Sequence, residues 1–477
     1  MILAMKKILL IGIPTLMILV IMARAPRQLR AQAAQSKAPS QNIPESARFL
    51  GAVSCASSNC HGSPNAKDPK AKDPAGKYYN VRQDEYFTWI KFDKHSKAYE
   101  VLGNELSKTI ARNLGLKAAH QSERCLTCHA LDSRPGAQAG TLDLSQGISC
   151  EACHGRASGW RDNHTEPGWR NQPSAVKAKA GLTALSNPLV RAETCLGCHL
   201  GSAKNNVDHE MLAAGHPDLR FELDNFADRM PRHWFSFTQR QDKTRRQESE
   251  YSRAWIIGQA VAFQKSLARL AERAKQPSWP EFAELDCFAC HHSLKDSSWR
   301  QANATKTGLG LPKWSQARFV MVRHIIAVFA PDKLPTINAD ADELANSMVA
   351  STVDGSRTAA IAMRLEKSLA PIVKELDQKL ERGVDAKQAR QFVDLIVKDL
   401  PYLMKTDIRS AEQAAFAVNS LVSDIARTSS DSNRKELAQA LESIVRHVET
   451  PERFDPATFG KHMQDLQKVL TRQGGAK

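Results

Sequence analysis

The sequence predicts a mainly α-helical protein in two parts: a cysteine-rich half with short helices and long loops, followed by a C-terminal helical bundle. Three observations lead to this expectation. All ten cysteines fall in short Cys/His motifs before residue 292. From residue 317 onward there is no cysteine, and apolar residues recur at the spacing of amphipathic helices. A length of 477 residues is enough for two or more domains.

The N-terminus has the pattern of an export segment. Lys6 and Lys7 precede an apolar run from residue 8 to residue 23, which is long for a signal peptide and short for a membrane span. We therefore expect residues 1–33 to be a signal peptide or a membrane anchor. Residues 34–48 are rich in Ala, Ser, Gln and Pro, which predicts a linker.

Four copies of Cys-x-x-Cys-His follow, and a fifth, wider copy has four residues between its cysteines. This spacing is typical of covalent haem attachment, in which two thiols bind the porphyrin edge and the histidine binds the iron. In the short copies the first cysteine and the histidine are four residues apart, hence on one helix face. The motif residues are Cys55, Cys60 and His61; Cys125, Cys128 and His129; Cys150, Cys153 and His154; Cys195, Cys198 and His199; and Cys287, Cys290 and His291.

Two other uses of cysteine were weighed. A structural zinc site needs two cysteine pairs, or one pair and two histidines, and not a histidine directly after every pair. A disulfide framework is the second alternative, but ten cysteines that all lie in haem motifs leave none for bridges. The alternative of a local disulfide stays open at the wide motif. The sequence thus predicts five haem c groups in a multihaem cytochrome c domain at residues 49–300.

Helical periodicity is strongest after the first four motifs. Residues 251–275 predict one long helix, and residues 294–315 a linker. A C-terminal helical domain is expected at 316–477. Its predicted helices cover residues 317–330, 341–352, 356–382, 385–404, 408–428, 432–449 and 457–472.

Each haem iron has a second face, and a second histidine there gives an iron suited to electron transfer. Ten histidines remain after the five motif histidines are assigned. His233 and His292 are further candidates for this role, and histidines in the C-terminal domain are expected to be packed or solvated. The histidines that we predict as second ligands are His95, His120, His164, His209 and His216.

The formal charge of +15 comes partly from five basic residues within positions 1–33. A basic protein can bind nucleic acid, but in an exported haem protein the charge suits haem propionates and acidic redox proteins better. We therefore expect redox protein partners, either other cytochromes or an oxidoreductase, and no nucleic acid. The N-terminus offers a membrane tether, and the oligomeric state is left open.

The chain resembles the multihaem cytochromes of the cytochrome c-554 type over about residues 50–300. The resemblance rests on five segments, and it implies a mostly helical periplasmic electron carrier with stacked haems and largely bis-histidine irons. This chain differs in its expected count of five haems and in its C-terminal helical domain. The segments that carry the resemblance are 55–62, 94–99, 150–155, 213–217 with 221–223, and 287–292.

We expect an electron carrier in the periplasm rather than an enzyme. The alternative is a multihaem oxidoreductase that acts on a small nitrogen or sulfur compound at one haem with an open face. The chain has no Cys-x-x-Cys-Lys motif, which excludes the lysine-ligated haem of the multihaem nitrite reductases. No catalytic residue is assigned.

Overall fold

The structure is a computed structural model that describes residues 47–72, 76, 79, 81–131, 142–235, 250–291, 312–349, 354–427 and 429–475. The expected signal or anchor segment, nearly all of the first linker and most of the second lie outside these residues. The described chain is built of helices and turns without a β-strand, apart from an isolated bridge between Leu285 and Trp314. The predicted mainly α fold is confirmed.

The cysteine-rich half consists of short helices joined by single turns, and side-chain caps fix where several of them begin. Asn104, Asn187 and Asp208 each accept hydrogen bonds from backbone N–H groups in the first turn of the helix that follows. These helices are α3 (Glu85–Phe92), α4 (Glu105–Asn113), α5 (Glu123–His129), α6 (Cys150–His154), α7 (Ser174–Lys179), α8 (Pro188–His199), α9 (His209–Ala213) and α10 (Leu223–Arg229).

The second half contains long helices where the periodicity predicted them, with two differences. The helix predicted from 341 begins earlier, at Leu334, with Pro335 in its first turn, where a proline is tolerated. The helix predicted at 385–404 is divided in two, because the first part ends at Lys398 and Pro401 lies in the first turn of the next. The helices are α12 (Glu250–Arg273), α13 (Cys287–Cys290), α15 (Val320–Phe329), α16 (Leu334–Val349), α17 (Gly355–Lys379), α18 (Ala386–Lys398), α19 (Leu400–Leu403), α20 (Ile408–Ala426), α21 (Asp431–Glu449) and α22 (Pro456–Gly475).

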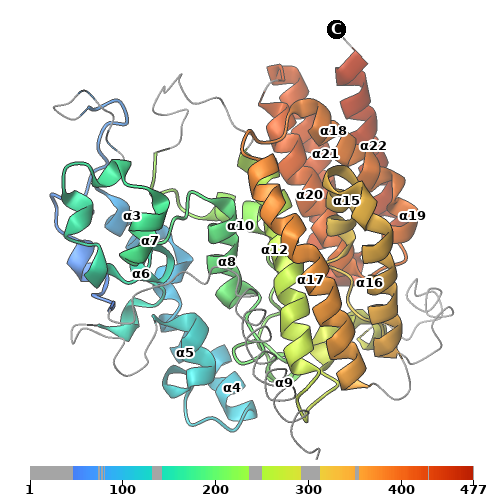
Figure 1. Cartoon of the computed structure of the whole chain (residues 1–477), viewed down its shortest axis with the longest axis horizontal. Coiled ribbons are helices and arrows are strands. Elements are labelled where there is room, and N and C mark those ends of the chain that lie inside the picture. The colour runs from blue at the N-terminus through green and yellow to red at the C-terminus, as the bar shows by residue number, and fades with distance from the viewer. Residues whose placement is uncertain are drawn as a thin grey trace, which may run out of the picture.

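Helix α12 joins the two halves. Figure 1 shows it between α8 and α10 on one side and the bundle helices α17 and α20 on the other. Its Trp255 and Phe263 are fully buried, and the Trp255 ring meets Phe392 of α18 edge-on at 5.6 Å. One continuous apolar core therefore runs from α8 to α22, across the expected domain boundary near residue 300. No helix in the described part of the chain is long and apolar enough to span a bilayer.

Buried charges fix the segments around the last two motifs. Glu284 is 6% exposed and forms ion pairs with Arg269 at 3.0 Å and with Arg273 at 2.6 Å, both on α12. The Arg269 guanidinium also donates to the Leu200 carbonyl at 2.7 Å, directly after the fourth motif. Because breaking a buried ion pair leaves an unpaired charge, these contacts hold both motif segments against α12.

Candidate functional site: five histidine pairs

Each of the five motif histidines faces one histidine from outside the motifs. The distances between ring centres fall between 6.1 and 6.5 Å. We number the sites 1 to 5 in the order of their motifs. The pairs are His61 with His164 at 6.2 Å, His129 with His216 at 6.3 Å, His154 with His233 at 6.2 Å, His199 with His95 at 6.1 Å, and His291 with His209 at 6.5 Å.

Site 1 is built on a closed loop. Between Cys55 and Cys60 the chain turns back on itself, and the His61 amide donates to the Cys55 carbonyl at 3.3 Å. Gly62 completes the turn, since a Cβ there would lie 1.9 Å from the Ala56 carbonyl oxygen. The longer spacing therefore brings His61 next to its first cysteine without a helix, and only glycine fits after it.

Sites 2, 3 and 4 are built on helices. Helices α5, α6 and α8 each end at the motif histidine, so the first cysteine and the histidine lie one turn apart on the same face. After His154 the chain leaves α6 through Gly155, which has a φ of 85°. A Cβ at Gly155 would lie 2.1 Å from the Gly181 carbonyl oxygen, so a larger residue would push this segment away.

Site 5 joins two segments that lie on either side of α12 in the sequence. Its motif lies on α13, and His209 begins α9, where its amide donates to Glu281 at 2.9 Å. The Phe282 side chain is 52% exposed, and its ring centre is 5.5 Å from that of His209. Both histidines of this pair are exposed to solvent.

Hydrogen bonds to the ring nitrogens set the tautomer of six paired histidines. In each of them Nδ1 lies near an oxygen that can only accept, so Nδ1 carries the proton and Nε2 keeps its lone pair. This is the form that binds a metal through Nε2. The acceptors are Glu85 for His61 at 3.2 Å, Asp93 for His95 at 2.9 Å, and the carbonyls of Ala98 for His129 at 2.7 Å, Pro217 for His216 at 2.8 Å, Pro231 for His233 at 3.4 Å and Arg161 for His164.

Burial keeps the inner imidazoles neutral. Loss of solvation lowers the pKa of His154 to about 4 and that of His199 to about 4. It also lowers the pKa values of His129 and His233. His95 differs, since its hydrogen bond to Asp93 raises its pKa. A neutral imidazole is the ligand form, so four of these rings need not lose a proton to bind a metal at neutral pH.

Hydrogen bonds between the motif segments show which sites are neighbours. The Gly51 amide, four residues before Cys55 of site 1, donates to Glu151 in the motif of site 3 at 2.7 Å. The carbonyl of His95 of site 4 accepts from the Ile148 amide, two residues before the motif of site 3, at 3.0 Å, and His129 of site 2 donates to the Ala98 carbonyl, three residues after His95. All ten cysteines are free thiols. The spatial order 1–3–4–2 therefore differs from the sequence order.

Site 5 continues this series next to site 2. Helix α9 begins at His209 of site 5, and His216 of site 2 follows its end. Arg124 of α5 holds α9 through ion pairs with Asp208 at 2.7 Å and Glu210 at 2.8 Å. The full order of sites through the protein is thus 1–3–4–2–5.

Four of the five histidines predicted as second ligands face a motif histidine: His95, His164, His209 and His216. His120 does not. It is exposed, its ring lies 6.5 Å from that of Tyr99, and its Nε2 contacts the Gln121 amide. His233, held between Pro231 and Trp234, occupies the remaining position. The candidate His292 lies outside the described residues.

Histidine proximity alone does not define these sites. In the bundle, the ring centres of His447 and His462 lie 5.8 Å apart. The Nε2 of His447, however, lies 2.8 Å from the Asp455 carbonyl oxygen and 3.1 Å from the Asp455 amide nitrogen, and no cysteine motif is nearby in the sequence. This pair is a packing contact.

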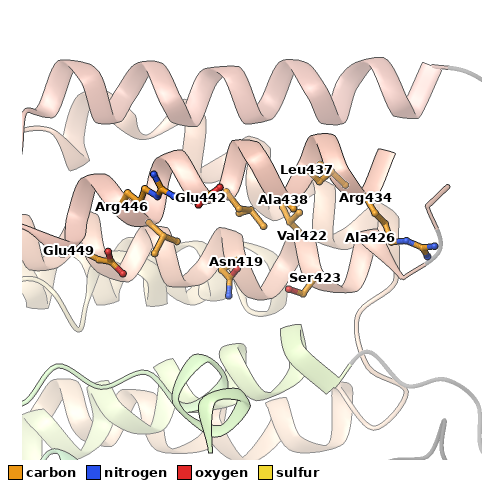
Figure 2. A pocket seen from close by; sticks show the side chains of 12 residues that line it. Asn419, Val422, Ser423, Ala426, Arg434, Leu437, Ala438, Glu442, Arg446 and Glu449 are labelled. Carbon is orange, nitrogen blue, oxygen red and sulfur yellow. Dashed lines mark hydrogen bonds and ion pairs between the residues drawn. The ribbon is translucent and has the colours of Figure 1, made fainter. Parts of the chain in front are cut away.

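A cavity of about 540 Å³ lies elsewhere, between α20 and α21 of the bundle. Figure 2 shows apolar side chains such as Val422 and Leu437 along it, with Arg434 and Glu442 beside them. Neither histidine nor cysteine is among its lining residues. It is separate from the paired sites and has no redox group of its own.

The family comparison fits this arrangement. Residues 82–155, which include the motifs of sites 2 and 3, match a family model described as Cytochrome c554 and c-prime. The chain therefore contains a segment of a c-type cytochrome, a haem protein class that works in electron transfer. The resemblance to the cytochrome c-554 type is confirmed over this segment. Neither a curated protein nor a solved structure matched the chain.

Haem c, which this family implies, fits the residues present. A metal–imidazole bond of about 2.0 Å and a ring centre roughly 1.1 Å from its nitrogen put the centres of two rings on one iron about 6.2 Å apart. The five pairs lie at 6.1 to 6.5 Å. Free thiols precede every motif histidine, and the exposed apolar side chains Val53 and Phe282 lie beside the motifs of sites 1 and 5.

Proposed function

We propose that this protein is a periplasmic pentahaem c-type cytochrome that relays electrons between redox partners. The observation that carries the proposal is the set of five histidine pairs, each of which joins a motif histidine to a histidine distant in sequence. When bound, haem iron supplies reversible one-electron chemistry, and two histidine ligands favour transfer over substrate binding. The residues proposed as second ligands are His164, His216, His233, His95 and His209 for sites 1 to 5.

The protein's own groups have three tasks in this proposal. The motif thiols hold the porphyrin edges through thioether bonds. The paired imidazoles bind from both faces, and the oxygens at Nδ1 hold each ring in the correct tautomer. Helix α12 and its ion pairs with Glu284 keep the segments of sites 4 and 5 at fixed positions, which a relay requires.

We also propose the cellular setting and the partners. Export through residues 1–33 agrees with thioether attachment outside the cytoplasm, and these residues are either removed or kept as a tether. Basic residues exceed acidic ones by 15 over the chain, which favours acidic redox proteins, either cytochromes or an oxidoreductase. The division into a haem domain at 49–300 and a helical domain at 316–477 is part of the same proposal.

Two measurements on the full-length, haem-loaded protein test the relay. A pyridine haemochrome assay with a protein determination should give five haems per chain. The oxidised protein should give only low-spin EPR signals, and the reduced protein should not bind carbon monoxide. A count of four, or stoichiometric carbon monoxide binding by the unaltered protein, would contradict the pentahaem bis-histidine assignment.

The alternative is an oxidoreductase for a small nitrogen or sulfur compound. One observation favours site 5 as its location: its imidazoles are both exposed and have the widest spacing of the five pairs, 6.5 Å. Carbon monoxide binding by the unaltered protein that is lost when Cys287→Ala and Cys290→Ala together prevent haem attachment at site 5, but not when Cys55→Ala and Cys60→Ala do so at site 1, would support this alternative.

A further inference from the structure

At sites 1 and 4 a carboxylate lies behind one histidine, whereas site 2 uses backbone carbonyls. Glu85 lies 3.2 Å from Nδ1 of His61 at site 1, and Asp93 lies 2.9 Å from Nδ1 of His95 at site 4. At site 2 both histidines donate to backbone carbonyls instead, at 2.7 and 2.8 Å. The sites therefore differ in the charge of the group that receives the imidazole proton.

Both carboxylates are held in place and are poorly solvated. The Glu85 side chain is 15% exposed, and its second oxygen accepts the Arg82 amide at 2.6 Å. The Asp93 side chain is 7% exposed, and the oxygen that faces the ring also accepts the His95 amide at 2.9 Å. Low exposure reduces the screening of their charge, so each acts on its imidazole over a short and fixed distance.

We propose that Glu85 and Asp93 are positioning residues that lower the reduction potentials of sites 1 and 4 below that of site 2. The inference rests on the proposed function, because it requires haem iron between the paired rings. A carboxylate that accepts the Nδ1 proton makes the imidazole a stronger electron donor, and its charge favours the ferric over the ferrous state. A neutral carbonyl that accepts the same proton lowers the reduction potential less.

The spatial order of the sites determines how these differences in reduction potential affect the path of an electron. In the order 1–3–4–2–5, site 3 lies between the two sites that have a carboxylate. Both carboxylates also lie within electrostatic range of His233 of site 3. Sites 1, 3 and 4 are therefore expected to have lower potentials than site 2, which makes the relay stepwise between site 4 and site 2.

Ring orientation allows sites 1 and 4 to be followed separately. The imidazole planes of site 1 are nearly parallel, at 13°, whereas those of site 4 are perpendicular, at 90°. Parallel planes give a rhombic low-spin EPR spectrum, and perpendicular planes give a highly axial one. Sites 2 and 3, at 88° and 75°, belong with site 4, and site 5 lies between the two groups at 37°, so the most rhombic signal identifies site 1.

The test is an EPR-monitored redox titration of the full-length protein and two variants, Glu85→Gln and Asp93→Asn. Each variant keeps an amide oxygen as acceptor and removes the charge. We expect Glu85→Gln to raise most the potential of the most rhombic signal and Asp93→Asn to raise most that of one axial signal, with a smaller rise at site 3, whose His233 lies within electrostatic range of both carboxylates, and with site 2 unchanged. Asp84→Asn is the matched control, since Asp84 adjoins Glu85 but pairs with Arg82 at 2.9 Å.

The outcomes separate this inference from the function on which it rests. Five haems per chain with unshifted potentials in both variants would overturn the inference and leave the relay intact. An equal shift in Asp84→Asn would also overturn it, because any nearby charge would then suffice. If a variant loses haem, the redox titration of the unaltered protein still tests the inference. A most rhombic signal with a higher reduction potential than every axial signal would contradict a lowered potential at site 1. A wild-type count below five would instead contradict the proposed function.

Discussion

Removal of the His233 imidazole is the sharpest test of the pairing, because sequence reasoning favoured His120 in its place. The ring centres of His233 and His154 lie 6.2 Å apart, and within the described residues no other histidine ring pairs with His154. The nearest ring to His233 is that of Trp234 at 5.1 Å, whose indole offers only an N–H donor. His233→Ala therefore leaves one iron with a single protein ligand and an open face.

The expected magnitude follows from the number of pairs. One of five irons should become high-spin in the oxidised variant, and the reduced variant should bind one carbon monoxide per protein, where the unaltered protein binds none. EPR spin quantitation and a carbon monoxide titration measure both values. His120→Ala is the control and should remain fully low-spin, because His120 is exposed and faces Tyr99. Carbon monoxide binding by the His120 variant, with none by the His233 variant, would refute the pairing.

Three further predictions address stability and haem attachment. Glu284→Gln leaves Arg269 and Arg273 buried without a counter-charge and should lower the free energy of unfolding by about 3–5 kcal/mol. Guanidinium denaturation followed by circular dichroism measures this change. The control Glu105→Gln, which removes an exposed ion pair, should leave the midpoint of denaturation unchanged. Burial, together with the charge of Glu222, raises the pKa of Asp224 well above its ordinary value. The contribution of the protonated Asp224 to stability is therefore complete at low pH and is lost as the pH rises through the folded-state pKa. The free energy of unfolding of Asp224→Asn should rise relative to that of the unaltered protein as the pH increases, and a pH-independent difference would contradict this. Gly62→Ala should reduce the haem count from five to four by preventing loop closure at site 1, while Gly197→Ala, where a Cβ meets no atom within 4 Å, should keep five.

The local features of the molecule could be predicted from the sequence. A motif histidine lies within a few residues of its cysteines, and the long helices have apolar residues at regular spacing. Both patterns can therefore be recognised in a short stretch of sequence. The second ligands are different, since His95 meets His199 and His154 meets His233 only through tertiary packing. Nothing in the neighbourhood of His120 or His233 distinguishes a ring that faces a motif from one that faces solvent. The spatial order of the sites, 1–3–4–2–5, could not be predicted from the sequence for the same reason.

This pattern of pairing also bears on how the two halves are stabilised. The pairs connect segments of the cysteine-rich half that are far apart in sequence, and each pair that binds one iron would close a long loop. The apolar cluster on α4 and α5 is small, with Leu102 and Leu126 as its largest buried members, whereas the bundle core runs without a break from α8 to α22. Folding of the first half should therefore depend on haem attachment, whereas α12 and the bundle can form from apolar burial alone. Because α12 packs against α8, the motif of site 4 would then be presented on an already folded surface, which makes it the natural starting point for the assembly of its neighbours.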